Sequence, residues 1–469
     1  MKRILSLSLA VILCFSLLSL AGCGGSSDAD LGTYTEDEVI GEVIENSGNN
    51  NGGSNNSGSG DSSGAVGGDA TEQAFFDNVP EELKGTTVKF ATWIDHKSTD
   101  YAYIFSDFEK LTGIKVEIVP VTQTDYIVKL AGMKASDIAP DVIVENGDFP
   151  RTLSLLQPIT KETTGIDVKD KFWDQDVTKL YTVGNKTYAI NGANSSWQMA
   201  SPLVYFNIPL LEKYGVKTPE EYVEDNNWTF DTMLRCMEEA KKAGIATPCE
   251  IDVSVFSNVY ANGPYHYDTA SNKYSNTMGT AKFKEVWNYL TSASEKGYAK
   301  LSNSWASSLT SGNTGFVISG AYGLRKQPGW FYQMNSDDIG YTYLPKMKKS
   351  DANYPTSTMT RAYGIAAGAK NAKGAGYFLR YFLNDDWYDL DDIFKDDRAK
   401  EMHMNLQKNK NFSKPQLEGV VLTQYDDFKV FFNELTTSTP AQVTANIDKI
   451  SQKLDYCVEK ANKLIANAK

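Results

Sequence analysis

The sequence has few of the residues that build metal centres and disulfide scaffolds. Only 3 His and 5 Cys occur among 469 residues, and His96, His266 and His403 share no ligand spacing. No Cys pair has zinc-finger spacing. The motifs of P-loops, zinc proteases and nucleophile triads are also missing, so nothing indicates catalysis. We therefore expect no metal, no cofactor and no enzymatic reaction.

Basic surfaces and long apolar runs are scarce as well. The 46 Lys and Arg face 59 Asp and Glu, which gives a formal charge of −13. Because nucleic-acid binding needs a basic face, this balance argues against a nucleic-acid partner. After residue 20, no apolar run approaches the roughly 18 residues of a spanning helix. Aromatic residues, in contrast, are plentiful, with 8 Trp, 26 Tyr and 21 Phe. The length suggests about two or three domains.

The first residues resemble an export signal with a lipidation site. Lys2 and Arg3 precede an apolar run at 4–20, and the run ends in Leu-Ala-Gly-Cys at 20–23, followed by Gly and Ser. This resembles the bacterial lipobox, which makes 1–22 a signal peptide and Cys23 the lipidated first mature residue. An ordinary secreted protein and a membrane-anchor helix are the alternatives. A diacyl anchor suffices for stable attachment, so the membrane would be contacted through lipid only.

A flexible tether is expected between this anchor and the folded body. Residues 28–45 are acidic, and 46–68 consist almost entirely of Asn, Gly, Ser and Asp. Such a segment cannot bury enough apolar surface to offset its ordering entropy. We predict a tether at 23–80 and a folded body from about residue 81. In that body a Cys236–Cys249 bridge and plain buried thiols are both possible.

The folded body begins with alternating strands and helices. Strands are predicted at 86–93, 114–121 and 140–144, and helices at 102–112 and 126–136, which favours a parallel sheet with right-handed crossovers. Later helices are expected at 209–214, 229–243, 280–296, 374–383 and 440–466, and strands at 315–319 and 364–367. The acidic run at 385–392 lacks the spacing of a calcium loop, and we expect a solvated surface there.

Seven short motifs follow one another in the order of a known family. They are FEKLTGIKV (108–116), PDVI (140–143), YAI leading to VYFN (188–207), LLEKYG (210–215), NWTFD (227–231), GNTGFVISG (312–320) and GIAAGAKNAK (364–373). Together they resemble the extracellular solute-binding proteins of the large sugar-binding class of ABC importers, which include the maltodextrin binders. The resemblance spans roughly 86–380. From 384 to 424 the sequence matches nothing in the family pattern.

The resemblance implies a two-lobed periplasmic-binding-protein-like α/β fold. Each lobe would be a mostly parallel sheet flanked by helices, with the ligand in a cleft between them, where ligand contacts drive hinge closure. Segments near 193–201 and 358–363 would cross between lobes. The expected division is 81–195 for the first part of lobe 1, 196–358 for the main part of lobe 2, 359–415 for the return to lobe 1, and 416–469 for C-terminal helices of lobe 2.

A sugar site needs exposed rings for apolar sugar faces and a few fixed polar groups for hydroxyls. Trp93, Asp95 and Lys97 follow the first strand; Trp93 is otherwise core, and Asp95 otherwise a helix N-cap. Asp148 follows the third strand and matches a ligand-binding Asp of the maltodextrin binders, although a turn role is the alternative. Tyr322 stands where those proteins carry a stacking Trp.

Four further candidates come from loops and crossings. Trp330 lies in a Pro-Gly loop, and Trp197 lies in the first crossing segment, facing either the cleft or the hinge. Arg361, at the second crossing, closes the pocket or donates to ligand oxygens. Tyr425 lies in a region that resembles the part of the family sequence where a late stacking residue occurs. By the same reasoning, we assign Trp228 and Trp287 to packing.

The sequence therefore predicts a monomeric, lipid-anchored binding protein on the extracellular face of the cell membrane. It would capture a carbohydrate, in particular an oligosaccharide, and deliver it to the transmembrane permease subunits of an ABC importer. A binding protein for another solute is the alternative, and a cell-surface glycoside hydrolase using a pair such as Asp95 and Asp148 is a third hypothesis. Arg361 and Lys97 leave an anionic sugar open.

Overall fold

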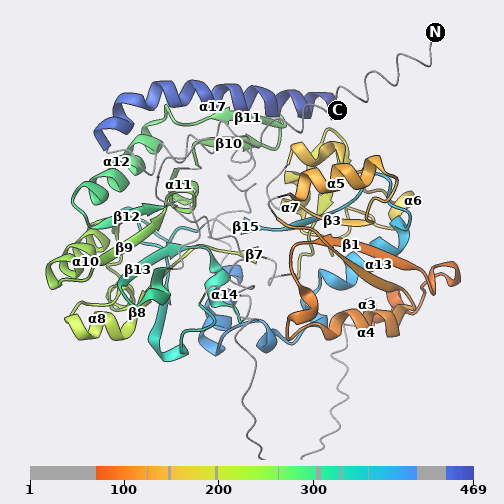
Figure 1. The fold of residues 1–469 in the computed structure, drawn as a ribbon, viewed down its shortest axis with the longest axis horizontal. Helices are drawn as coiled ribbons and strands as arrows, with labels where there is room; N and C mark the ends of the chain where they lie inside the picture. Colours follow the sequence, from red (N-terminus) through yellow and green to blue (C-terminus); the bar gives the residue numbers. More distant parts are fainter. Residues whose placement is uncertain are drawn as a thin grey trace, which may run out of the picture. The chain divides into compact units, whose positions relative to one another are not determined.

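The computed structural model describes residues 70–468 apart from 124, 146–148, 196–198, 262, 303–307, 327–328, 330, 357–358 and 409–439. Two five-stranded sheets organise this part of the chain, and we call each sheet with its helices a lobe. In Figure 1 the strands from the first part of lobe 1 are orange, and the strands of lobe 2 run from green to blue-green.

Lobe 1 is built on the predicted strand–helix alternation. Its sheet has the order β2 (Lys115–Pro120), β1 (Thr87–Thr92), β3 (Val142–Glu145), β16 (Ala362–Ile365), β6 (Ala189–Ile190). Of these, only β16 runs antiparallel to its neighbours. The helices are α4 (Tyr103–Thr112), α5 (Tyr126–Ala135), α6 (Lys161–Thr164), α7 (Gln175–Leu180) and α13 (Ala372–Phe382). Gly113 at φ 73 ends α4, as a left-handed C-terminal residue should.

Lobe 2 repeats this plan. Its sheet has the order β12 (Ala299–Ser302), β9 (Thr247–Asp252), β13 (Thr314–Ser319), β8 (Leu203–Asn207), β14 (Ile339–Thr342), and only β8 runs against its neighbours. The helices are α8 (Ile208–Tyr214), α9 (Pro219–Glu224), α10 (Phe230–Ala243), α11 (Val253–Ala261) and α12 (Ala281–Glu295). Trp228 and Trp287 are buried, so their assignment to packing is confirmed. The prediction of two mostly parallel sheets is confirmed as well.

The two crossing segments pair with each other. In the first, β7 (Met199–Ala200) runs antiparallel to β15 (Met359–Thr360) of the second. The first crossing also binds the chain at 384–386, because Asn194 Nδ2 donates to Asn384 Oδ1 at 3.0 Å and to Asp386 Oδ1 at 2.9 Å. At Gly192 a Cβ would lie 1.8 Å from the carbonyl oxygen of Leu383, so only glycine fits this approach.

The acidic run at 385–392 is not the uniformly solvated surface that we expected. Asp385 is only 9% exposed, and its backbone N–H donates to the Asn194 carbonyl oxygen at 2.7 Å. Asp385, the first residue of the run, packs closely against the first crossing between the lobes, and this packing excludes water from it.

Residues 393–408 belong with lobe 2, whereas the sequence assigned 359–415 to lobe 1. Phe394 forms a β-bridge with Arg325, and Lys395 N–H donates to Leu324 at 2.8 Å. The helix α14 (Asp397–Lys408) follows, and Arg398 donates to the Ser336 carbonyl beside β14. The sequence at 393–408 contains no family motif, so its pairing with a loop of lobe 2 could not be predicted.

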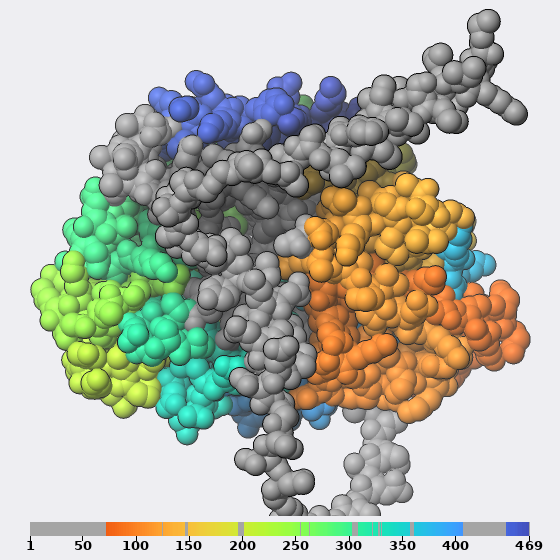
Figure 2. Space-filling view, viewed as in Figure 1, coloured from red at the N-terminus to blue at the C-terminus, as the bar shows by residue number. Residues whose placement is uncertain are grey.

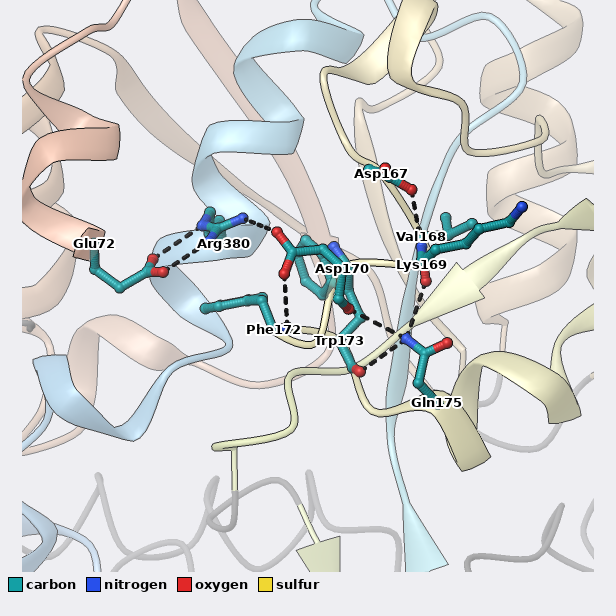
Figure 3. A network of polar contacts seen from close by, with 9 residues as sticks. All are labelled: Glu72, Asp167, Val168, Lys169, Asp170, Phe172, Trp173, Gln175 and Arg380. Atoms are coloured by element: carbon teal, nitrogen blue, oxygen red, sulfur yellow. Dashed lines mark hydrogen bonds and ion pairs between the residues drawn. The ribbon is translucent and has the colours of Figure 1, made fainter.

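The folded body starts earlier than predicted, because the expected tether at 23–80 ends in a docked helix. In α3 (Ala70–Phe76), Phe76 is buried against the rings of Tyr381 and Trp387. Arg380 of α13 holds Glu72 through two hydrogen bonds, at 2.9 and 2.7 Å, and Asp170 through one at 3.2 Å (Figure 3). This bidentate pair and the buried ring fix α3 to lobe 1.

A hairpin and the C-terminal helix contact both lobes. The hairpin β10 (Tyr265–Asp268) and β11 (Lys273–Asn276) packs along α17 (Pro440–Ala468), which also contacts α12. On the side of lobe 1, Asn272 Nδ2 donates to the Thr182 carbonyl at 2.8 Å in β4 (Thr182–Val183). Lys186 of β5 (Lys186–Thr187) donates to the Ala468 carbonyl at 3.2 Å. The predicted assignment of α17 to lobe 2 is therefore incomplete.

One long side of α17 lies at the surface in the space-filling view, where the helix is deep blue (Figure 2). Tyr456 and Leu464 of α17 are exposed. Across the described ranges, no helix combines the length and the apolar character that crossing a membrane requires.

Candidate functional site

Three predicted site residues meet in the structure. Trp93 follows β1 of lobe 1, Tyr322 lies in a 3₁₀ turn (Ala321–Leu324) after β13 of lobe 2, and Arg361 precedes β16 at the second crossing. The guanidinium carbon of Arg361 lies 5.7 Å from the ring centroid of Trp93 and 5.0 Å from that of Tyr322. A cation at the crossing thus contacts one aromatic ring from each lobe.

Trp93 is held at its position by lobe 1. Its ring packs edge-on against Tyr126, with the centroids 5.0 Å apart, and Tyr126 donates from its hydroxyl to the Ala91 carbonyl of β1 at 3.0 Å. The Trp93 side chain is half-buried, so it is not a pure core residue. Its indole Nε1 is buried and finds no hydrogen-bond acceptor within the described residues.

Tyr322 is held by the packing of its turn on lobe 2. Tyr205 of β8 donates to the Gly320 carbonyl at 2.8 Å and so fixes the end of β13. A Cβ at Gly323 would lie 2.5 Å from the Phe331 ring and 2.9 Å from Tyr205, so the turn presses directly on these rings. The Tyr322 ring itself remains half-buried.

Sequence reasoning missed Arg325, which belongs to this group. Its guanidinium carbon lies 4.5 Å from the Tyr322 ring centroid, closer than that of Arg361. Its backbone is fixed by the bridge to Phe394. The sequence did offer one indication of Arg325: it stands three residues after Tyr322, in the loop that follows the predicted strand at 315–319.

The two arginines set the electrostatics of the site. Burial lowers the pKa of Arg325; the neighbouring Tyr322 opposes this shift, and the charge of Arg361 adds to it. Burial, followed by the charge of Arg361, lowers the pKa of His96 to about 3, although Asp95 opposes the shift. His96 is 1% exposed and stacks on Phe90 with the centroids 5.6 Å apart. The imidazole is therefore neutral at physiological pH.

Asp95 and Lys97 lie at the surface. Asp95 caps a short 3₁₀ turn (His96–Ser98), because its carboxylate accepts from the Lys97 N–H at 3.2 Å and from the Ser98 hydroxyl. The capping role that we considered for Asp95 is thus present. Ligand contacts by Asp95 and Lys97 stay predictions.

The remaining predicted residues lie outside the part of the chain that the structure describes. They are Cys23, Asp148, Trp197, Trp330 and Tyr425. Within the described residues, no group of three or more His, Cys, Asp or Glu side chains is placed to hold a metal ion. Cys236, Cys249 and Cys457 are buried free thiols, so the structure contains no Cys236–Cys249 bridge.

The chain is similar to known proteins in both sequence pattern and fold. Residues 91–389 match the family model described as bacterial extracellular solute-binding protein. No curated protein matches the chain. Among solved structures, the GacH receptor of Streptomyces glaucescens has a TM-score of 0.59 at 15% identity, covering 82% of this chain and 99% of its own.

Two further structures agree. The sugar-binding protein MalE of Xanthomonas citri has a TM-score of 0.58 at 16% identity, covering 81% of this chain and 99% of its own. The galacto-N-biose-/lacto-N-biose I-binding protein of Bifidobacterium longum has a TM-score of 0.59 at 15% identity, covering 82% of this chain and 98% of its own. At these identities the likeness establishes the fold, and the expected two-lobed α/β fold is confirmed.

Proposed function

Because the chain belongs to the family of bacterial extracellular solute-binding proteins, we propose that it captures an extracellular carbohydrate, in particular an oligosaccharide, and delivers it to an ABC permease. One observation carries the choice of ligand class. Trp93 and Tyr322, one ring from each lobe, lie on the same guanidinium of Arg361. Aromatic faces that meet between two lobes suit the apolar faces of sugar rings.

Similar proteins support this ligand class. The GacH receptor was solved in complex with acarbose, and the Bifidobacterium longum protein in complex with lacto-N-biose. Both ligands are saccharides. The structural likeness extends to both lobes of this chain, and the same fold therefore accommodates sugars of different composition.

Capture follows from the division of the site between lobes. A ligand that contacts Trp93 and Tyr322 together gains its full binding energy only when the lobes adopt one relative arrangement. Its differential affinity for that arrangement shifts the population of closed molecules. Arg361 lies at the crossing, where its guanidinium contacts the rings of both Trp93 and Tyr322. Closure then presents one defined surface to a permease.

Attachment through Cys23 completes the proposal. Lipidation at the end of residues 1–22 would keep the captured ligand near the permease, with residues 23–69 as the connecting segment. A Cys23→Ala chain should move from the membrane fraction to the soluble fraction. Retention of this chain in the membrane after an alkaline wash would contradict the anchor.

The ligand class is tested by calorimetric titration of the purified protein with a panel of oligosaccharides, amino acids, peptides and polyamines. The proposal expects binding within the oligosaccharide set only. Any bound oligosaccharide should also be recovered unchanged after long incubation, because the proposed function includes no reaction. Binding confined to another solute class, or recovery of shortened products, would refute the proposal.

A further inference from the structure

The strand order of lobe 1 reverses its direction at β1. The chain places β2 on one side of β1, and then passes through α5 to place β3 on the other side. Because β1 and β3 run parallel, their carboxyl ends lie at the same edge of the sheet. In open α/β sheets, ligands bind beyond the carboxyl ends of the strands at such a switch point.

The ladder between β1 and β3 stops short of this edge. β1 pairs with β2 as far as Thr92, and β3 pairs with β16 as far as Glu145. Between β1 and β3, however, the last pair is Ala91 with Ile143. In a continued parallel ladder, the Val144 N–H would donate directly to the Ala91 carbonyl. The sheet is therefore open between these two strands, while each strand stays paired with its outer neighbour.

The hydroxyl of Tyr126 fills the opening. It accepts from the Val144 N–H at 2.8 Å and donates to the Ala91 carbonyl at 3.0 Å, so it takes the place of the missing ladder bond. A direct bond would bring this nitrogen and oxygen within about 2.9 Å of each other, and the inserted hydroxyl keeps them further apart. Tyr126 is the first residue of α5 and is 3% exposed. The start of the helix that leads from β2 to β3 lies at the carboxyl edge of the sheet, which brings the hydroxyl between the strands.

The ring of Tyr126 also supports the indole of Trp93. Trp93 follows Thr92 at the end of β1, and its ring meets the Tyr126 ring at an interplanar angle of 89° with the centroids 5.0 Å apart. The indole also contacts the guanidinium of Arg361 at the crossing. The position of the indole thus depends on Tyr126 in two ways, through the ring contact and through the separation of β1 from β3.

We propose that Tyr126 is a positioning residue of the carbohydrate site: its hydroxyl holds β1 and β3 apart at the switch point, and its ring orients Trp93 to receive a sugar ring. This inference rests on the proposed carbohydrate function. Because Tyr126 is buried, it acts on the ligand through Trp93. A merely structural tyrosine would change stability alone, whereas a positioning residue changes the ligand affinity of the folded protein.

Removal of a single oxygen atom tests the proposal. Tyr126→Phe keeps the ring beside Trp93 but lets the Val144 N–H approach the Ala91 carbonyl, so the end of β1 and the indole should move. Tyr260→Phe is the matched control, because Tyr260 is 5% exposed and its hydroxyl also donates to a backbone carbonyl, that of Pro345 in lobe 2. Both variants keep their aromatic rings, and both are measured below the onset of thermal unfolding.

The first measurement uses no ligand. In the full chain labelled with heavy nitrogen, the indole N–H resonance of Trp93 is identified by its loss in Trp93→Phe. Tyr126→Phe should shift this resonance, and Tyr260→Phe should leave it in place. An unmoved resonance in Tyr126→Phe would overturn the inference whatever the ligand is.

The second measurement is calorimetric titration with acarbose, lacto-N-biose, maltotriose and cellotriose as probes. A probe that the wild type binds should bind Tyr126→Phe at least about tenfold more weakly, because a displaced indole no longer matches the sugar face. Tyr260→Phe should stay within about twofold of the wild type, because it lies outside the site and additive effects on binding are absent at a distance.

Equal affinity of Tyr126→Phe and the wild type would overturn the inference and leave the carbohydrate function standing. Equal weakening in Tyr260→Phe would also overturn it, because the loss of any buried hydroxyl would then explain the effect. Binding of none of these saccharides by the wild type would contradict the proposed function, and the inference would fall with it.

Discussion

The buried imidazole of His96 predicts a specific pH dependence of stability. Burial and the charge of Arg361 lower its pKa from 6.5 to about 3, so in the folded protein it stays neutral well below pH 6. In the unfolded chain it gains a proton as the pH falls through about 6.5. The unfolded state then binds more protons than the folded state, and the stabilising effect present above pH 6.5 is lost progressively between pH 6.5 and about 3.

The size of the effect follows from the interval. Each pH unit below the unfolded pKa costs about 1.4 kcal/mol, so lowering the pH from 7.5 to about 5 should remove about 2 kcal/mol through this residue alone. Carboxylates also titrate in acid, and a variant must therefore isolate the imidazole. His96→Phe keeps a ring beside Phe90 and Tyr101 and has no titrating group.

Urea unfolding at both pH values provides the measurement. The free energy of unfolding of the wild type relative to His96→Phe should fall by about 2 kcal/mol from pH 7.5 to about 5. His266→Gln, which removes an exposed imidazole on β10, serves as the control and should behave like the wild type. Equal pH dependence in wild type and His96→Phe would refute the reasoning.

Three further predictions concern packing. Arg380→Ala leaves Glu72 and Asp170 without their buried partner and should lower the free energy of unfolding by about 3–5 kcal/mol, whereas Lys84→Ala, which breaks an exposed pair with Glu81, should cost about 0–1 kcal/mol in the same urea titration. A result in which both cost the same would contradict the docking of α3. Gly192→Ala places a Cβ against the Leu383 carbonyl and should lower the melting temperature by more than about 5 °C, and an unchanged value would contradict this close approach. A thiol reagent should label Cys236, Cys249 and Cys457 only after denaturant is added. Rapid labelling of these three residues in the native state would show that they are accessible.

The sequence predicted what depends on local pattern. The strands β1, β2 and β3 and the helices between them follow from hydrophobic periodicity, because each element buries one face or both within a short stretch of chain. Tyr322 and Arg361 were found through their places in family motifs and at a crossing. For such residues, position along the chain already indicates that they lie where the two lobes meet.

What the sequence missed depends on partners distant in the chain. Arg325 joins the group because it contacts the same Tyr322 ring as Arg361, which lies 36 residues later in the chain. Hydrophobic periodicity does not predict such a contact. The docking of α3 depends on Arg380, and the Phe75-Phe76 pair was its only local signal. The bridge between Phe394 and Arg325 likewise joins segments without a shared motif.

Replacement of Tyr322 tests the central claim most directly, that an oligosaccharide is bound between the two lobes against aromatic rings. Calorimetric titration compares the wild type, Tyr322→Ala and Tyr332→Ala; the last removes another half-buried tyrosine of the same lobe. Tyr322→Ala should weaken binding of the oligosaccharide by about 1–3 kcal/mol, the scale of a buried, stacked ring, and Tyr332→Ala should leave it unchanged. Wild-type affinity in Tyr322→Ala would contradict the claim.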